Sequence, residues 1–347
     1  MASYLAGRQR ALSPTISNQL MDFSLTEEQS MLVASCDRLV RERCTFEARR
    51  AQLEQDPARR PALWRDLAEI GVTALAVPED AGGLGRPMID AALVAQSLGR
   101  GWLLEPFIDC AMAAAHTLAS LPASDVRDRT LAAIASGERI VIPLVDKQAA
   151  HAAYADALLA LRDDRLLLVE AGKTKRRVYR NFDGCAAAEV TFAPDDAYVL
   201  AGAAAARAAW QAGQDAARIG RIAEGVGLAR TVLDATAEYL RTRKQFGQPI
   251  GRFQALAHRM ADLLIQFEQA QSLTWAAAMK SDSTRTLAAA QVLAHRALRA
   301  IGQQAVQLHG GIGMTDEFAV SHYVKRLLAI EIELGNVDDA LARFAAA

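Results

Sequence analysis

Residues 243–254 read R-K-Q-F-G-Q-P-I-G-R-F-Q, which fits the pattern R-x-x-F-G-x-x-I-x-x-F-Q. A second stretch, residues 307–313, reads Q-L-H-G-G-I-G, or Q-x-x-G-G-x-G. Each stretch interrupts a long, Ala-rich amphipathic pattern that is typical of helices. The two stretches therefore predict breaks at the ends of neighbouring long helices. The groups presented there are Arg243, Phe246, Gln254, Gln307, Gly310 and Gly311.

These side chains have the chemistry to bind a pyrophosphate and an adenosine. The guanidinium of Arg243 is permanently charged, and its planar fork matches phosphate oxygens. Phe246 can lie against a flat heterocycle, and Gln254 can hydrogen-bond a ribose or a ring edge. Taken singly, Arg243 is typical of a surface salt bridge and Phe246 of a core aromatic. Their shared spacing, with the glycine stretch about fifty residues later, favours the binding interpretation.

Composition excludes several classes of protein. The chain has 347 residues, of which 52% are hydrophobic, and its formal net charge is -1. Nucleic-acid surfaces need concentrated positive charge, so we expect no nucleic-acid partner. No run of about 18 apolar residues occurs, which predicts that no helix crosses a membrane. The scattered cysteines lack metal-ligand spacing, which predicts no metal site and reduced core thiols in a cytoplasmic protein. They are Cys36, Cys44, Cys110 and Cys185.

The hydrophobic period divides residues 22–347 into three parts. Residues 1–21 lack an apolar run, and we expect a disordered extension there. Residues 22–138 predict an N-terminal helical domain, whose first helix opens with a capping box at residues 26–29. Residues 139–205 change to strand spacing, and residues 206–347 return to long helices that carry the two stretches quoted above. The expected fold class is α+β: an N-terminal helical domain, a reduced antiparallel β middle domain and a C-terminal antiparallel helix bundle.

The expected elements can be given by range. Helices of the N-terminal part are predicted over residues 27–49, 59–70, 87–98 and 106–121. Strands are predicted near residues 139–145, 157–161, 166–169, 177–179 and 188–192. Helices of the bundle are predicted over residues 207–245, 253–279, 284–308, 316–333 and 336–346.

In the two stretches quoted first, the chain resembles the acyl-CoA dehydrogenase family, which uses FAD to desaturate acyl-CoA thioesters. The resemblance is strongest over residues 219–335 and also covers residues 21–138. It implies that six residues contact the pyrophosphate and adenosine of FAD: Arg243, Phe246, Gln254, Gln307, Gly310 and Gly311. In the family these contacts are made in trans, to the FAD of the neighbouring subunit.

Two groups of residues that the family uses within one subunit are missing. The family holds the flavin ring with a Y-x-x-T-E-x-x-A-G-S-D segment and a W-I/V-T strand, and this chain has neither. The family's catalytic base is a carboxylate at one of two positions. Registering on Gly335 puts Leu334 at the first position, and counting back from Arg243 puts Ala217 at the second. Neither side chain accepts a proton.

Other titratable residues are weaker candidates for catalysis. Glu333 is one residue from the first base position, which swings its side chain by about 100° on a helix. We interpret it as a carboxylate at the solvent or at an interface. Glu224 lies in mid-helix and is weaker still. His309 and His322 belong to a residue type that is common in catalysis, but no nucleophile or carboxylate motif accompanies them, so we expect packed or surface histidines.

The residues that the family uses for contacts to the neighbouring subunit's FAD are retained, whereas the residues that it uses within one subunit are missing. This pattern predicts the short subunit of a heteromeric acyl-CoA dehydrogenase, a heterotetramer in which a longer homologous subunit supplies the base and the substrate pocket. The resemblance implies a bulky or ω-functionalised acyl-CoA from lipid or steroid catabolism, and an electron-transfer flavoprotein as the electron acceptor. Two alternatives stay open. One is a self-sufficient FAD enzyme that uses Glu333 as base, and the other is a non-catalytic scaffold protein.

Overall fold

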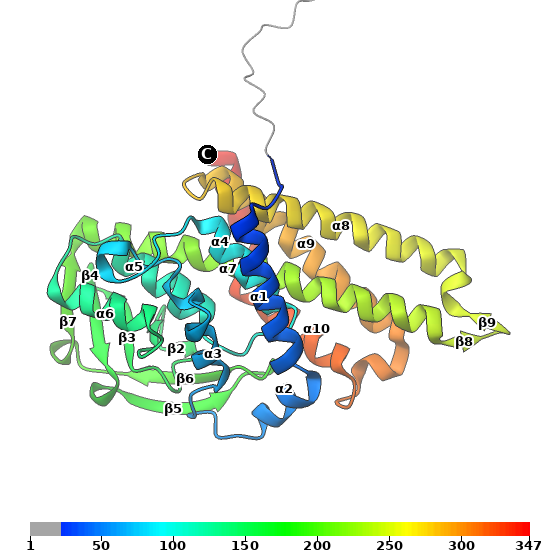
Figure 1. Ribbon diagram of the computed structural model, residues 1–347, viewed down its shortest axis with the longest axis horizontal. Coiled ribbons are helices and arrows are strands. Elements are labelled where there is room, and N and C mark those ends of the chain that lie inside the picture. Colours follow the sequence, from blue (N-terminus) through cyan, green and yellow to red (C-terminus); the bar gives the residue numbers. More distant parts are fainter. Residues whose placement is uncertain (1–21) are drawn as a thin grey trace, which may run out of the picture.

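The computed structural model describes residues 22–347, and the extension predicted for residues 1–21 lies outside them. The described chain has the predicted order of a helical part, a small β part and a helix bundle (Figure 1). One long helix, α7, runs from the β part through the middle of the molecule to the hairpin at the far end of the bundle. It is therefore the element that connects all the sites described below.

The N-terminal part begins with the predicted capping box. The hydroxyl of Thr26 accepts the backbone N–H of Gln29, and the side chain of Gln29 accepts the backbone N–H of Thr26. Each side chain thus satisfies a backbone donor that the first turn of a helix leaves free. The helices are α1 (Glu27–Arg43), α2 (Phe46–Leu53), α3 (Leu63–Glu69), α4 (Met88–Gly99), the π-helical η3 (Phe107–Ala114), α5 (Ala115–Ala119) and α6 (Asp125–Ala135).

The β part contains two small sheets. One has the strand order β1-β3-β4-β7 and the other β2-β6-β5. The strands are β1 (Val141–Pro143), β2 (Gln148–Ala150), β3 (Ala157–Arg162), β4 (Arg165–Glu170), β5 (Lys175–Arg180), β6 (Ala186–Thr191) and β7 (Tyr198–Gly202). The small β domain was predicted, but its pairing is not purely antiparallel, because β1 runs parallel to β3. The chain between these two strands crosses to the other sheet as β2, so it returns to β3 in the same direction.

The bundle consists of α7 (Ala203–Thr242), α8 (Gln254–Met279), α9 (Thr284–His309), α10 (Ala319–Glu333) and α11 (Val337–Ala346). A short hairpin, β8 (Lys244–Gln245) and β9 (Gln248–Pro249), joins α7 to α8. Glycines let α7 cross α4 closely: a Cβ on Gly227 would lie 1.9 Å from the Gln96 carbonyl oxygen. A Cβ on Gly99 would lie 2.2 Å from the carbonyl oxygen of Glu224. The backbone of α7 at Glu224 is therefore fixed against the N-terminal domain.

The four cysteines are buried and free, as the sequence predicted. Over residues 22–347, no helix is both long and apolar enough to span a lipid bilayer.

Candidate functional site

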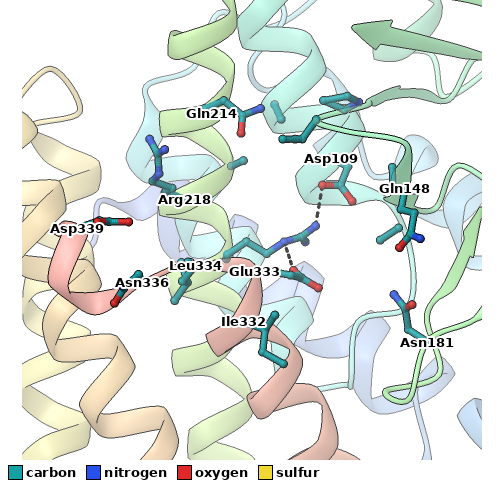
Figure 2. A pocket seen from close by; sticks show the side chains of 18 of the residues that line it. Asp109, Gln148, Asn181, Gln214, Arg218, Ile332, Glu333, Leu334, Asn336 and Asp339 are labelled. Carbon is teal, nitrogen blue, oxygen red and sulfur yellow. Dashed lines mark hydrogen bonds and ion pairs between the residues drawn. The ribbon is translucent and has the colours of Figure 1, made fainter. Parts of the chain in front are cut away.

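A pocket of about 640 Å³ lies where the three parts of the chain meet (Figure 2). Its wall is built from η3, the β part, α7 and the turn between α10 and α11. Both positions that the resemblance assigns to a catalytic base are in this wall, Ala217 on α7 and Leu334 at the end of α10. A methyl group and an isobutyl group therefore stand where a proton acceptor would be needed. The wall also carries polar groups from Gln148, Asn181, Gln214 and Asn336.

The guanidinium of Arg221 lies on the wall of this pocket and is bound from both sides. Its Nη2 is 2.7 Å from Oδ1 of Asp109, and its Nε is 2.5 Å from Oε2 of Glu333. Figure 2 shows Asp109 and Glu333 facing each other across this group. A third carboxylate, that of Glu224, lies 3.5 Å from Nη1. Arg221 therefore ties η3 to α10 across the inside of the pocket.

A second guanidinium, Arg326 on α10, lies behind the first, and its side chain is only 2% exposed. Its Nε and Nη2 donate to the two oxygens of Glu224 at 2.7 Å and 2.9 Å, which is a bidentate pair. Its Nη1 is 2.7 Å from Asp183 and 2.8 Å from Oε1 of Glu333. We call these six side chains the buried ion network: Asp109, Asp183, Arg221, Glu224, Arg326 and Glu333.

The buried ion network holds four carboxylates and two guanidinium groups. His151 adds a further contact, because its Nδ1 is 2.7 Å from Oδ2 of Asp109. Burial by itself would raise the pKa of Asp109, but Arg221 and His151 outweigh it and hold that pKa well below its ordinary value. Burial likewise opposes the charge of Arg221, but Asp109, Glu333 and Glu224 outweigh it and raise its pKa. Asp109 and Arg221 are thus charged at neutral pH, and each of the four carboxylates contacts at least one of the two guanidinium groups.

Glu333 is an exposed residue, in line with its interpretation as a carboxylate at the solvent, and it also makes two ion pairs that the sequence did not indicate. Its side chain is 26% exposed and lines the pocket, because α10 places it between the two arginines. Both of its oxygens already accept from guanidinium groups, one from Arg221 and one from Arg326. Proton abstraction by Glu333 would have to break at least one of these contacts. Glu224, the weakest candidate from the sequence, is completely buried and fully paired with the same two arginines.

The second candidate region is the end of the bundle, which we call the tip: residues 243–254 and 307–313. All six residues predicted to bind are exposed to solvent there: Arg243, Phe246, Gln254, Gln307, Gly310 and Gly311. The two stretches are brought together by Tyr239, one turn before Arg243, which packs against His309 with ring centroids 4.6 Å apart and an interplanar angle of 33°. The tip is thus a feature separate from the pocket.

Two tip residues have identities that packing among the described residues does not require. Phe246 is 89% exposed, and the two-residue turn of the β8–β9 hairpin gives it a φ of 53°, a left-handed conformation that is costly for a bulky side chain. Gly311 has an ordinary φ, and a Cβ there would meet no atom of the described residues within 4 Å. Packing and backbone geometry therefore allow alanine at Gly311 and disfavour phenylalanine at position 246. An external group that stacks on the ring and approaches the glycine backbone would account for both.

The two histidines are packed, as the sequence predicted. His309 is buried, and its Nδ1 is 2.8 Å from the carbonyl oxygen of Ala305. His322 is also buried, with its Nε2 2.8 Å from the carbonyl oxygen of Asp316 and its ring 5.0 Å from that of Trp102. In the part of the chain from residue 22 onward, no three His, Cys, Asp or Glu side chains are grouped so that they could hold a metal ion.

The buried ion network was not predicted from the sequence. A signal was present: Arg221 and Glu224 stand three residues apart in an otherwise apolar run, residues 219–228. Charged residues are rarely buried unless they are paired, so such a run implies partners elsewhere in the chain. The partners Asp109, Asp183 and Arg326 are distant in sequence, and only the fold identifies them.

Comparison with known proteins gives matches over most of the chain. The family description "Acyl-CoA dehydrogenase, N-terminal domain" matches residues 26–138, and "Acyl-CoA dehydrogenase, C-terminal domain" matches residues 202–345. The chain is 32% identical to the acyl-CoA dehydrogenase IpdE2 of Mycolicibacterium smegmatis over 325 residues. This alignment covers 93% of the chain and 99% of IpdE2.

Solved structures also match over most of the chain. The crystal structure of the ChsE4-ChsE5 complex from Mycobacterium tuberculosis superposes with a TM-score of 0.85 and 25% identity. The match covers 94% of this chain and 98% of that chain. A variant of the Tcur3481-Tcur3483 steroid ACAD superposes with a TM-score of 0.82 over 92% of this chain and 97% of that chain. At 23% identity, this second match supports the fold alone.

Proposed function

This chain belongs to the acyl-CoA dehydrogenase family, and we propose that it is the short subunit of a heteromeric, FAD-dependent acyl-CoA dehydrogenase. In this role it closes the adenosine–pyrophosphate site of the FAD that a longer, catalytic homologue holds. The observation that carries the proposal is the contrast between the two regions. The tip exposes binding groups that packing among the described residues does not require, whereas neither of the two family base positions in the pocket, Ala217 and Leu334, carries a proton acceptor.

The residues of the tip fit one end of FAD. Arg243 supplies an exposed permanent cation for the pyrophosphate. Phe246 offers an exposed ring on which a purine can stack, as nucleic-acid bases do on aromatic side chains. Gly310 and Gly311 leave open space next to the backbone, where any side chain would stand in the way of a phosphate. Gln254 and Gln307 are exposed amides that can hydrogen-bond a ribose or a ring edge.

The pocket does not fit the redox end of FAD together with a reacting thioester. When bound, FAD accepts a hydride from the substrate β-carbon, and a base must take the α-proton. Ala217 and Leu334 cannot take a proton, and Glu333 is bound by two guanidinium groups. The charges of Asp109 and Arg221 also compensate each other within the protein, so they are not free to orient a ligand. The base and the substrate pocket are therefore assigned to the longer partner.

One relative supports a heteromer. ChsE4-ChsE5 is a complex by its description, and the chain matches it along nearly its whole length. On the family resemblance, we extend the proposal to an acyl-CoA with a large, steroid-like acyl group, and to an electron-transfer flavoprotein that reoxidises the flavin.

Flavin content with and without a partner tests the proposal. We expect the chain purified alone to carry almost no flavin and to show no dehydrogenase activity, because the ring cradle and the base are absent. Co-expression with a longer acyl-CoA dehydrogenase encoded beside it should give a yellow complex with one FAD for each heterodimer, measured by flavin absorbance. A stable complex without flavin would favour the scaffold alternative. Flavin and turnover in the chain alone would contradict the proposal.

Substituting Glu333 separates the short subunit from the self-sufficient enzyme. Glu333 lines the pocket beside the family base position, and this placement is the one observation that favours self-sufficiency. We expect Glu333→Gln in the assembled complex to leave turnover within about twofold of the unsubstituted complex, because an amide keeps the shape and no proton is taken there. The measurement is turnover per bound flavin with an acyl-CoA substrate. Loss of turnover with flavin still bound would make Glu333 the base.

A further inference from the structure

Three aromatic rings join the two stretches of the tip. The imidazole of His309 lies between the rings of Tyr239 and Phe318, with centroids 4.6 Å and 5.1 Å away. Tyr239 is on the last turn of α7, His309 is the last residue of α9, and Phe318 immediately precedes α10. Three helix ends thus meet on one buried ring.

Each ring is next to a group that the proposed function uses. The carbonyl oxygen of Tyr239 accepts the backbone N–H of Arg243 at 2.8 Å, so the position of the tyrosine sets where the arginine leaves the helix. His309 directly precedes Gly310, whose φ of 65° and ψ of -146° turn the chain out of α9. Phe318 closes the loop that begins at Gly310. Displacement of any ring would move a backbone segment that faces the cofactor.

The chemistry of His309 is that of a packing group. A carbonyl oxygen only accepts, so Nδ1 donates its hydrogen to Ala305, and in the neutral ring Nε2 carries none. Nε2 is buried without a hydrogen-bond partner in the described structure. Burial lowers the pKa of His309, which keeps the ring neutral at physiological pH. The position therefore requires a flat, neutral ring, because only one of the two imidazole nitrogens forms a hydrogen bond.

From this geometry we infer that His309 is a positioning residue of the FAD site: its ring sets the distance between the Arg243 end of α7 and the glycine loop after α9. The inference rests on the proposed function, since it takes the tip to be the binding site. His309 touches neither substrate nor cofactor in this assignment. It acts through the two backbone segments that it holds together.

The isolated chain tests the positioning without any cofactor. His309→Ala should speed amide hydrogen exchange in residues 243–253 and 310–318 while leaving exchange in the β part unchanged, because a cavity replaces the ring between three helix ends. His309→Phe should restore slow exchange, since it keeps the ring and loses only the Nδ1 bond. His116→Ala is the matched control: its Nδ1 makes the same bond to a carbonyl four residues earlier, at 2.8 Å from Met112. It lies on α5, at the opposite end of the molecule from the hairpin (Figure 1).

FAD affinity of the complex with the longer partner tests the role in binding. His309→Ala should weaken FAD binding by about tenfold, the loss expected for a misplaced phosphate contact, whereas His309→Phe and His116→Ala should bind FAD as the unsubstituted complex does. An unchanged affinity in His309→Ala, with FAD bound normally by the unsubstituted complex, overturns this inference and leaves the proposed function standing. An equal loss in His309→Phe also overturns it, because the imidazole would then act by its polarity. An unsubstituted complex that binds no FAD overturns both.

Discussion

Replacing Arg326 with leucine is expected to lower the free energy of unfolding of the isolated chain by about 3 to 5 kcal/mol. The side chain is 2% exposed and pairs with Glu224, Asp183 and Glu333. Glu224 and Asp183 are fully buried, so neither can exchange the lost pair for water. Leaving a buried carboxylate unpaired costs far more than the pair itself contributes. Urea denaturation, followed by circular dichroism, measures the change.

A surface arginine provides the control for this substitution. Arg177 on β5 pairs with Glu189 at 2.6 Å, but its side chain is 74% exposed. Arg177→Leu should change the free energy of unfolding by less than about 1 kcal/mol, the range for exposed pairs. Adding Glu224→Gln to Arg326→Leu should recover part of the lost free energy of unfolding, because it removes the charge of a buried carboxylate that has lost its bidentate partner. A loss below about 1 kcal/mol in Arg326→Leu would contradict the conclusion that Arg326 stabilises buried carboxylates in the ion network.

Replacing Arg243 with alanine is expected to weaken FAD binding by the complex by about 10- to 100-fold, as the removal of one charge-assisted phosphate contact predicts. Arg243 is exposed and forms no salt bridge within the described chain, so its loss should leave the unfolding of the isolated chain unchanged. The expected result is therefore lost flavin in an intact complex. Equilibrium dialysis of FAD against the complex, with a thermal melt of the isolated chain, measures both parts.

The neighbouring Arg241 is the matched control for Arg243. It is also exposed and lies two residues earlier, but its guanidinium pairs with Glu238 at 2.6 Å. Arg241→Ala should keep FAD bound, because that charge is directed to its own helix. Flavin occupancy that does not change in Arg243→Ala would count against the tip as the pyrophosphate site.

Much of the fold could be predicted from local pattern. The hydrophobic period gave α8 and α9 nearly to their observed ends, and the capping box placed the start of α1. Both signals are local, because a helix repeats its contacts every few residues. Two of the missed elements have little local signal: β2 has three residues, two of them alanine, and α2 has eight residues beside a longer helix. The strand β7 and the eleven-residue helix α6 were also missed, although Ser124 caps the start of α6. The parallel pairing of β1 with β3 depends on which sheet β2 joins, which no local pattern encodes.

The sequence by itself determined which residues this protein contains: the two tip stretches, Leu334 and Ala217 at the positions that the resemblance assigns to the base, and the family resemblance that the comparisons confirmed. Residue identities suffice for such statements. Only the tertiary structure decided that Glu333 is bound by two arginines rather than free, and that the ring of His309 joins α7 to α9. The physical reason is that a buried charge or ring acts through its partners. Those partners come from distant parts of the chain and meet only when the core closes around them.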